Sequence, residues 1–222
     1  MKILITGATG MVGQGVLHQC LAAPDVTQVL TLGRTPVVQV HAKLQQLTVA
    51  NLMALDVHES ALQDLDACFY CMGVSSSGMS EEAYRELTCD VTLKVANTLC
   101  RLNPDMTFVY VSGAGTDSSE QGRSMWARVK GKTENDLKKL PLHSVYLFRP
   151  GIIAPLHGIQ SKTPLYRHFY TWAGPVLSLI RRWMPSAIVT TDDIGNAMLN
   201  AARQRGGRVT VEAKDIGRLA RG

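Results

Sequence analysis

The stretch ITGATGMVGQG, residues 5–15, joins a short apolar run to a run with helical spacing. Three of its glycines, Gly7, Gly10 and Gly13, meet separate needs. The first lets the chain turn tightly out of a strand, the second lets backbone approach a ligand, and the third lets the next helix pack close to the strand. The amino end of that helix presents free N–H groups and partial positive charge, which favour a phosphate. The sequence therefore predicts a phosphate-binding turn between a first strand and a first helix.

The rest of the chain alternates apolar strand-like runs with helical patterns. The expected strands cover residues 2–6, 28–32, 44–49, 67–72, 107–111 and 144–148. The expected helices cover residues 11–22, 58–65, 80–101 and 124–140, with Ser80 as an N-cap. Such alternation produces right-handed βαβ units and a mostly parallel sheet. We predict an α/β fold, a doubly wound parallel sheet of the Rossmann type with a small C-terminal cap.

The pattern changes after Pro150. Residues 162–189 are aromatic and apolar, and they are followed by an expected helix, strand and terminal helix at residues 190–204, 208–212 and 213–222. We interpret residues 1–222 as a single domain in which residues 151–190 form a lid or cap. The alternative is that this apolar segment is an interaction surface for a partner or a membrane.

The amino-acid composition limits the classes of protein to which the chain can belong. The chain has 222 residues, of which 45% are hydrophobic and 18% are charged, as in one soluble globular domain. The net charge of +5 fits an anionic ligand such as a nucleotide, and no block of consecutive basic residues predicts nucleic-acid binding. No apolar run reaches the roughly 18 residues that a membrane span needs.

The cysteines give no sign of a disulfide framework. There are five of them, and Cys68 and Cys71 form a C-x-x-C inside an apolar run that reads as a buried strand. Reduced, inert thiols in a cytoplasmic protein are the expectation. The amino terminus reads as a strand and not as a signal peptide. No His or Cys cluster has zinc-ligand spacing, so no metal site is predicted.

The glycine spacing T-G-x-x-G-x-x-G at residues 6–13 resembles that of the extended and atypical short-chain dehydrogenases/reductases. This family includes epimerases, reductases and NmrA-like regulatory relatives. Other stretches follow in the family's order: LGR at 32–34, LDV at 55–57, CMGV at 71–74, VSGAG at 111–115, W-x-x-x-K at 126–130 and RPG at 149–151. The resemblance covers roughly residues 1 to 155 and implies a nicotinamide dinucleotide cofactor. The expected cofactor contacts are Gly7, Thr9, Gly10, Met11, Val12, Gly13, Arg34, Asp56, Val57, Cys71, Met72, Gly73, Lys130, Pro150, Gly151 and Ile153.

The end of the second strand bears on the choice of nucleotide. A carboxylate there would bind the ribose hydroxyls of NAD and repel a 2′-phosphate, but the position holds Gly33 and Arg34. A guanidinium can pair with a phosphate, so NADP is favoured over NAD. The alternative is that Arg34 is a solvated loop charge. Asp56 resembles the family aspartate that lies near the adenine amino group. The alternative interpretation is that Asp56 caps a helix.

The expected helix from residue 124 carries the chemistry that the resemblance implies. In the family, a lysine holds the nicotinamide ribose, a tyrosine one turn earlier transfers the proton, and a serine orients the substrate oxygen. The matching residues here are Lys130 and Ser112, the predicted catalytic residues, but Trp126 stands at the tyrosine position. An indole N–H donates a hydrogen bond and does not titrate usefully.

Three explanations follow from the tryptophan. The acid lies elsewhere, with Tyr166, Tyr170, His157 and His168 as candidates from the tail. Or the reaction takes its proton from solvent, as some quinone reductions do. Or the protein binds NADPH without consuming it, as a redox sensor or regulator. The alternative without a catalytic role is an ordinary amphipathic helix whose Lys130 is solvated.

The leading hypothesis is an NADPH-dependent oxidoreductase acting on an unknown small carbonyl or quinone-like substrate. A homodimer paired through the long helices is compatible with the resemblance.

Overall fold

The computed structural model describes residues 1–159 and 188–222. Its strands are β1 (Lys2–Thr6), β2 (Gln28–Gly33), β3 (Leu44–Thr48), β4 (Ala67–Tyr70), β5 (Thr107–Val111), β6 (Ser144–Arg149), β7 (Ile152–Ala154), β8 (Ile188–Thr190) and β9 (Arg208–Glu212). Its helices are α1 (Met11–Ala22), the 3₁₀ helix η1 (Leu52–Leu62), α2 (Glu81–Arg85), the π-helical turn η2 (Glu86–Asp90), α3 (Val91–Leu102), α4 (Met125–Lys139), α6 (Thr191–Gln204) and α7 (Ala213–Leu219).

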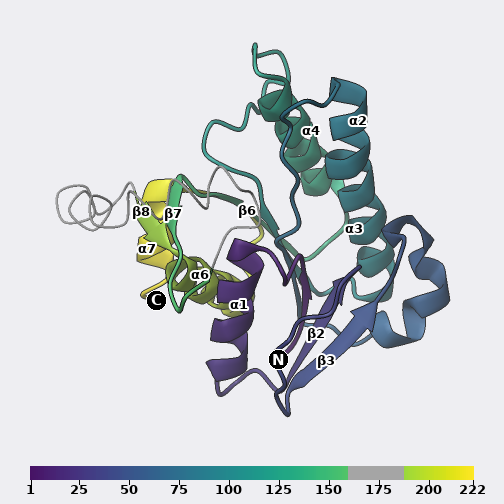
Figure 1. Ribbon diagram of the computed structural model, residues 1–222, viewed down its shortest axis with the longest axis vertical. Coiled ribbons are helices and arrows are strands. Elements are labelled where there is room, and N and C mark those ends of the chain that lie inside the picture. Colours follow the sequence, from purple (N-terminus) through teal and green to yellow (C-terminus); the bar gives the residue numbers. More distant parts are fainter. Residues whose placement is uncertain (160–187) are drawn as a thin grey trace.

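Within the described residues, seven parallel strands form the central sheet (Figure 1). Their order across the sheet is β3-β2-β1-β4-β5-β6-β9. β1 lies between β2 and β4, with Leu4 opposite Leu30 on one side and Cys68 on the other. The chain winds outward from β1 to β3 and then crosses back to β4, so the winding direction reverses beside β1. This is the doubly wound sheet that the sequence predicts, and ligands of such sheets bind outside the carboxyl ends of the strands at that reversal.

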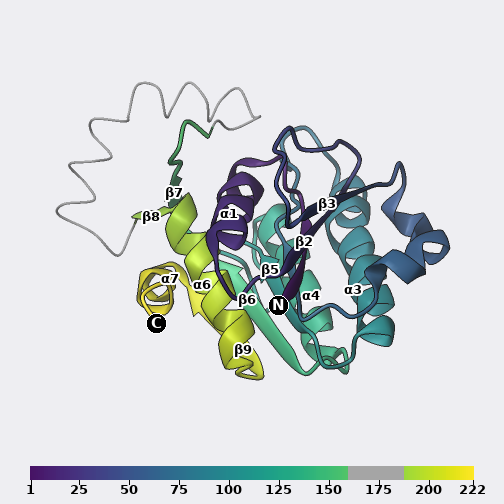
Figure 2. The ribbon, with the colours of Figure 1, turned by 90° about the horizontal axis from the view of Figure 1, so that it is seen from below.

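Helices cover both faces of the sheet (Figure 2). Because side chains alternate along a strand, Ile3 and Ile5 of β1 pack on one face and Leu4 packs on the other. The first face is covered by α1 and α6, and the second by η1, α3 and α4. Burial of apolar side chains on both faces explains why the strands read as near-continuous apolar runs.

The helix expected over residues 80–101 is three segments. Ser80 caps it as predicted, since its hydroxyl accepts a hydrogen bond from the backbone N–H of Ala83. The segments α2, η2 and α3 then follow one another, with a π-helical turn at Glu86–Asp90. Apolar spacing alone does not reveal a π turn, because the insertion of one residue leaves much of the helical pattern intact.

Several boundaries also differ from the sequence reading. The helix expected at residues 58–65 is the 3₁₀ helix that begins at Leu52. β4 ends at Tyr70, so Cys71 and Met72 lie in the loop that follows.

The carboxyl-terminal part extends the same sheet and helix layer. β9 pairs with β6, and Thr190 begins α6 with a capping box that it shares with Asp193. β7 and β8 form a separate two-stranded parallel sheet. Most of the predicted lid, residues 151–190, lies outside the described residues. Within those that are described, no helix is both long and apolar enough to cross a membrane.

Candidate functional site

The glycine-rich turn lies where β1 ends and α1 begins, as the sequence predicts. Gly7 has a positive φ of 69°, and its carbonyl accepts a hydrogen bond of 2.9 Å from the backbone N–H of Gly10. Gly10 is the N-cap of α1, and no side chain caps it. The first backbone N–H groups of α1 are therefore open to a ligand at the carboxyl edge of the sheet.

Steric contacts explain the glycines of this turn. A Cβ at Gly13 would lie 2.1 Å from the carbonyl oxygen of Gly7, and one at Gly7 would lie 2.7 Å from the backbone nitrogen of Met72. At Gly10 the nearest atom to a Cβ would be the Gly7 oxygen at 3.3 Å. The chain thus has a structural need for glycine at positions 7 and 13. At position 10 the need is weaker, which leaves close approach of a ligand as the better reason for glycine there.

The loop after β4 lies against this turn. The backbone N–H of Cys71 donates to the carbonyl of Thr6 at 3.2 Å, and Met72 contacts Gly7 as described. The space beside Gly73 is open, with no atom within 4 Å of a Cβ built there. The structure therefore brings Cys71, Met72 and Gly73 together with the glycine turn. Burial raises the pKa of the Cys71 thiol to about 12, as expected of an inert thiol.

Thr9, Met11 and Val12 belong to the same turn and the first turn of α1. The Thr9 carbonyl accepts a hydrogen bond of 3.1 Å from the side-chain amide of Gln14, and Val12 packs partly against the core. These contacts tie the turn to α1 and to the core.

Arg34 is exposed directly after β2, at the same edge of the sheet. Its guanidinium makes no ion pair with any residue in the described ranges. The loop that carries it is fixed by Gln46 on β3, whose side chain both accepts from and donates to the backbone of Val37. Arg34 is therefore an available cation on an anchored loop.

The structure does not bring Asp56 and Val57 to this edge. Asp56 lies on η1 and pairs with Lys94 of α3 at 3.1 Å, and Val57 is 81% exposed. The hollow that Asp56 lines extends to Pro104 and Pro141, which precede β5 and β6 and so lie toward the opposite edge of the sheet. Asn51, closer to the end of β3, was not predicted. Its side chain caps η1 by accepting from the backbone N–H of Met53.

Ser112 follows β5, but its hydroxyl points into a buried ion-pair network. Its Oγ donates to Glu134 of α4 at 2.6 Å and also lies 3.1 Å from the carbonyl of Phe148. Glu134 is fully buried and pairs with Arg149 at the end of β6. A hydroxyl has one hydrogen to donate, so Ser112 holds β5, α4 and β6 together and does not offer that hydrogen to a substrate.

Lys130 lies one turn before Glu134 on α4. It is half-buried, and its ammonium donates to the backbone carbonyl of Ser112. Burial lowers the pKa of Lys130 to about 8, against a smaller opposing influence of Glu134. The predicted lysine therefore lies beside Ser112, in an environment that perturbs its charge.

Trp126, at the tyrosine position, fills apolar space. Its indole packs against a small cluster of Tyr84, Cys89 and Val129, and its ring edge would lie 3.5 Å from a Cβ at Gly115. No titratable group occupies this position. Of the other candidate acids, His157 pairs with Asp192 beside α1 and α6, whereas Tyr166, Tyr170 and His168 lie outside the described residues.

Gly131 and Glu134 are further residues of the site that sequence reasoning missed. The loop between β5 and α4 crosses α4 so closely that a Cβ at Gly131 would lie 1.7 Å from the carbonyl oxygen of Asp117. The Asp117 carboxylate also accepts from the backbone N–H groups of Ser119 and Gly122. The available signals were a glycine directly after the candidate lysine and a glutamate one helical turn after it.

The loop after β6 completes the edge. The Pro150 carbonyl accepts a hydrogen bond of 2.8 Å from the backbone N–H of Ala114, which joins this loop to the one after β5. Gly151 is exposed, and Ile153 on β7 packs against the core cluster that contains Ala8 of the glycine turn. One edge of the sheet therefore carries the loops that follow β1, β2, β4, β5 and β6.

Comparison with known proteins assigns the family. A sequence profile described as the NAD dependent epimerase/dehydratase family matches residues 3–134, which include the glycine turn, Ser112 and Lys130. The chain belongs to this family. The predicted resemblance to extended short-chain dehydrogenases/reductases is therefore confirmed.

Relatives with curated names come from fungi. A protein named fmp52, mitochondrial, from Emericella nidulans is 27% identical over 211 residues, covering 90% of this chain and 86% of its own length. Another of that name, from Aspergillus clavatus, is 30% identical over 159 residues, covering 69% of this chain and 67% of its own. These names overturn the expected cytoplasmic location. Reduced cysteines argue only against an oxidising compartment, so they could not distinguish the cytosol from an organelle.

Several solved structures are similar to this chain in fold. The Bordetella bronchiseptica enzyme WbmF in complex with NAD⁺ is 17% identical, with a TM-score of 0.68 and coverage of 99% of this chain and 76% of its own. UDP-glucuronic acid 4-epimerase from Bacillus cereus in complex with NAD is 15% identical, with a TM-score of 0.69 and coverage of 96% and 78%. The reductase domain of PhqB from Penicillium fellutanum is 17% identical, with a TM-score of 0.67 and coverage of 94% and 66%.

Proposed function

We propose that this chain is an NADP(H)-dependent oxidoreductase that reduces a small carbonyl or quinone-like compound without a catalytic tyrosine. The observation that carries the proposal is the glycine turn. Gly10 caps α1 with backbone alone and leaves room for a diphosphate against the first N–H groups of the helix. Membership of an NAD dependent family, and the NAD⁺ complexes of proteins with the same fold, support a nicotinamide dinucleotide as the ligand.

The preference for NADP rests on Arg34. The guanidinium lies at the end of β2, where the adenosine ribose is held in Rossmann domains, and it has no carboxylate partner among the described residues. A 2′-phosphate would supply that partner through charge-assisted hydrogen bonds.

Asn51 is better placed than Asp56 to contact the adenine of the dinucleotide. Asn51 follows β3 by three residues and so lies nearer the carboxyl edge of the sheet, whereas Asp56 lies farther along η1 and pairs with Lys94.

The proposed catalytic residue is Lys130. When bound, the reduced nicotinamide supplies a hydride, so the protein has to position the substrate and deliver one proton. Trp126 cannot deliver it, but an ammonium whose pKa burial lowers to about 8 can release a proton near neutral pH and regain one from solvent. Lys130 also has spare N–H donors beyond its bond to Ser112, and these fit the ribose hydroxyls that the resemblance assigns to it.

We assign Ser112 a positioning role. The Ser112 hydroxyl donates to Glu134, and the Ser112 carbonyl accepts from Lys130. Ser112 therefore links the lysine to the ion pair of Glu134 and Arg149. This network fixes the lysine relative to the edge of the sheet.

The second candidate function is a non-catalytic NADP(H)-binding regulator. It is favoured by Trp126, whose indole packs against Tyr84 and Val129 and puts an apolar group where the family has its acid. A regulator needs the glycine turn and Arg34 but no proton donor.

One experiment distinguishes the two. NADPH and NADH are titrated calorimetrically, and NADPH consumption is then followed with aldehydes, ketones and quinones. The enzyme hypothesis predicts NADPH binding and substrate-dependent oxidation that Lys130→Met abolishes while binding persists. Tight binding with no oxidation by any substrate favours the regulator. Absence of binding refutes both.

A further inference from the structure

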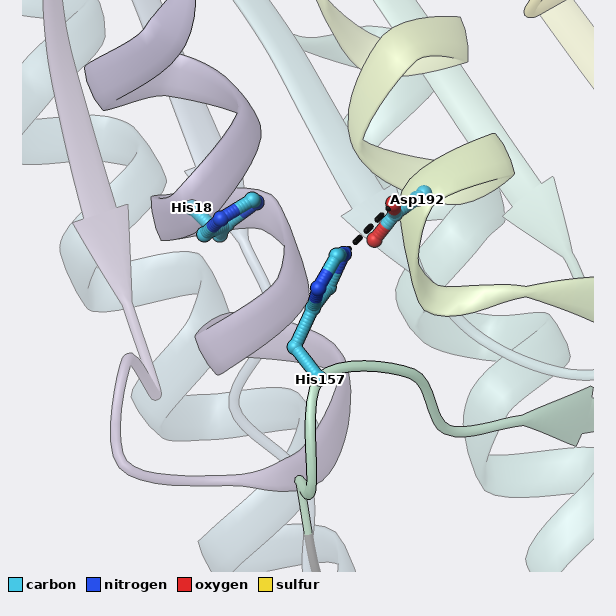
Figure 3. Close-up of side chains that lie close together, drawn as sticks. All are labelled: His18, His157 and Asp192. Atoms are coloured by element: carbon cyan, nitrogen blue, oxygen red, sulfur yellow. Dashed lines mark hydrogen bonds and ion pairs between the residues drawn. The ribbon is translucent and has the colours of Figure 1, made fainter.

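A cluster of two histidines and one aspartate lies apart from the dinucleotide site. His18 is on α1, His157 is in the loop after β7, and Asp192 is in the first turn of α6. Figure 3 shows the ring of His157 pointing up between the other two side chains. His18 is the seventh residue after Met11, where α1 begins, so the cluster lies about 10 Å along the helix from the phosphate turn.

The three side chains are already close enough to share an ion. One ligand atom from each lies within 4.8 Å of the other two. The Nε2 atom of His157 lies 2.8 Å from an oxygen of Asp192, and the rings of His18 and His157 stack with centroids 4.3 Å apart. Ligand atoms around a tetrahedral zinc ion are about 3.3 Å apart, given bonds of about 2.0–2.1 Å. The atoms are thus about 1.5 Å or less too far apart, and the two rings have to turn out of their stack so that one nitrogen of each faces the ion.

The scaffold that carries these side chains is closely packed. A Cβ at Gly15 of α1 would lie 2.4 Å from the side chain of Thr191, and one at Gly195 of α6 would lie 2.7 Å from that of Gln19. The two helices therefore cross at close range, with the Thr191 side chain against Gly15 and the Gln19 side chain against Gly195. The loop is held as well, since the backbone N–H of Leu156 donates to the Thr191 hydroxyl at 3.2 Å. A site on such elements is held together before any ion arrives.

Asp192 has unused capacity to bind a cation. One of its oxygens pairs with His157, but the other is buried and makes no hydrogen bond to any residue that the structure describes. A buried, unpartnered carboxylate oxygen is costly, and a metal ion would satisfy it.

We propose that His18, His157 and Asp192 bind a zinc ion that joins α1, α6 and the loop after β7. Two imidazoles and a carboxylate suit zinc and its neighbours among the divalent transition metals, and they suit magnesium poorly. A fourth position is left for water. The ligands come from three distant parts of the chain, which is why spacing along the sequence gives no sign of the site. The proposal is independent of dinucleotide binding.

Titration with cobalt and zinc tests the site. Tag-free protein, stripped with a chelator, is titrated with Co²⁺ while visible absorption is followed, and Zn²⁺ is then added to displace it. We expect one equivalent of Co²⁺ with the bands of a tetrahedral site, displacement by Zn²⁺, and no competition from excess Mg²⁺. The variants His18→Gln, His157→Gln and Asp192→Asn are each expected to weaken binding at least tenfold.

The matched control is His41→Gln. His41 lines the hollow beside α1 with His18 but is not part of the cluster. Circular dichroism checks that each variant is folded, and having three separate variants guards against the failure of any one. Equal binding by His18→Gln and His41→Gln would overturn the site. So would no stoichiometric zinc in the wild type, or a thiolate-to-cobalt band, which would place the metal on cysteines.

Discussion

Replacing Lys130 with methionine tests the electrostatics of the candidate site. Burial lowers the pKa of Lys130 from an ordinary 10.5 to about 8. Between these two values the unfolded chain binds more protons than the folded protein does. The contribution of Lys130 to the free energy of unfolding therefore rises with pH across this window, and below about pH 8 the buried charge is destabilising.

The size of the effect follows from the two pKa values. Each pKa unit corresponds to about 1.4 kcal/mol, so the interval from 10.5 to about 8 amounts to about 3 kcal/mol. Because the side chain is only half-buried, solvent screening reduces this to about 1–3 kcal/mol. The lost hydrogen bond to the Ser112 carbonyl offsets about 1 kcal/mol of any gain in the variant.

Urea denaturation of the protein without dinucleotide, at pH values from 7 to 10.5, measures this difference. The stability of Lys130→Met relative to wild type should fall by about 1–3 kcal/mol between the ends of the range. Lys139→Met is the control, because that lysine is on the same helix and its side chain is 72% exposed. The other titrating groups are common to the proteins compared, so their contributions cancel in the difference between each variant and wild type. Parallel stability curves for wild type and Lys130→Met would refute the assignment of a half-buried ammonium with a lowered pKa.

Three other substitutions test separate parts of the site. Arg34→Ala should weaken NADPH binding about 10–100-fold and leave NADH binding unchanged, because only NADPH carries the extra phosphate; equal loss for both nucleotides in calorimetry would count against the pairing. Gly131→Ala should cost about 1–3 kcal/mol in thermal unfolding, since its Cβ would overlap the Asp117 carbonyl; an unchanged melting temperature would contradict that contact. Glu134→Gln should lower the free energy of unfolding by about 3 kcal/mol, because it leaves the largely buried Arg149 without its main partner. A decrease of less than about 1 kcal/mol in urea denaturation would argue against a buried ion pair.

The sequence was sufficient for the fold because its signals are local. Glycine spacing, apolar runs and capping residues such as Ser80 each act within a few residues, and they predicted the parallel sheet and most helix boundaries. Lys130 and the loops at the carboxyl edge could be predicted for the same reason, since parallel strands all end on one side of a sheet.

What the sequence did not reveal depends on contacts between distant residues. Ser112 has the position of a substrate-binding serine, but Glu134 takes up its hydroxyl, and only the packing of α4 on β5 and β6 determines that. Asp56 was chosen by its place in a short motif, whereas Lys94 on another helix fixes its direction. The cluster of His18, His157 and Asp192 likewise exists only once three distant segments have come together.

The central claim is that a dinucleotide diphosphate lies against the glycine turn at the start of α1, and Gly10→Ala tests it most directly. A Cβ at Gly10 comes no closer than 3.3 Å to the protein, so the variant should fold, but it would stand where the ligand approaches. The control is Gly217→Ala on α7, where the nearest atom is the end of the flexible Arg221 side chain at 3.7 Å. In calorimetric titration with NADPH, the wild type and Gly217→Ala should bind alike, and folded Gly10→Ala should bind at least tenfold more weakly. Equal binding by all three proteins, or no binding by the wild type, would contradict the claim.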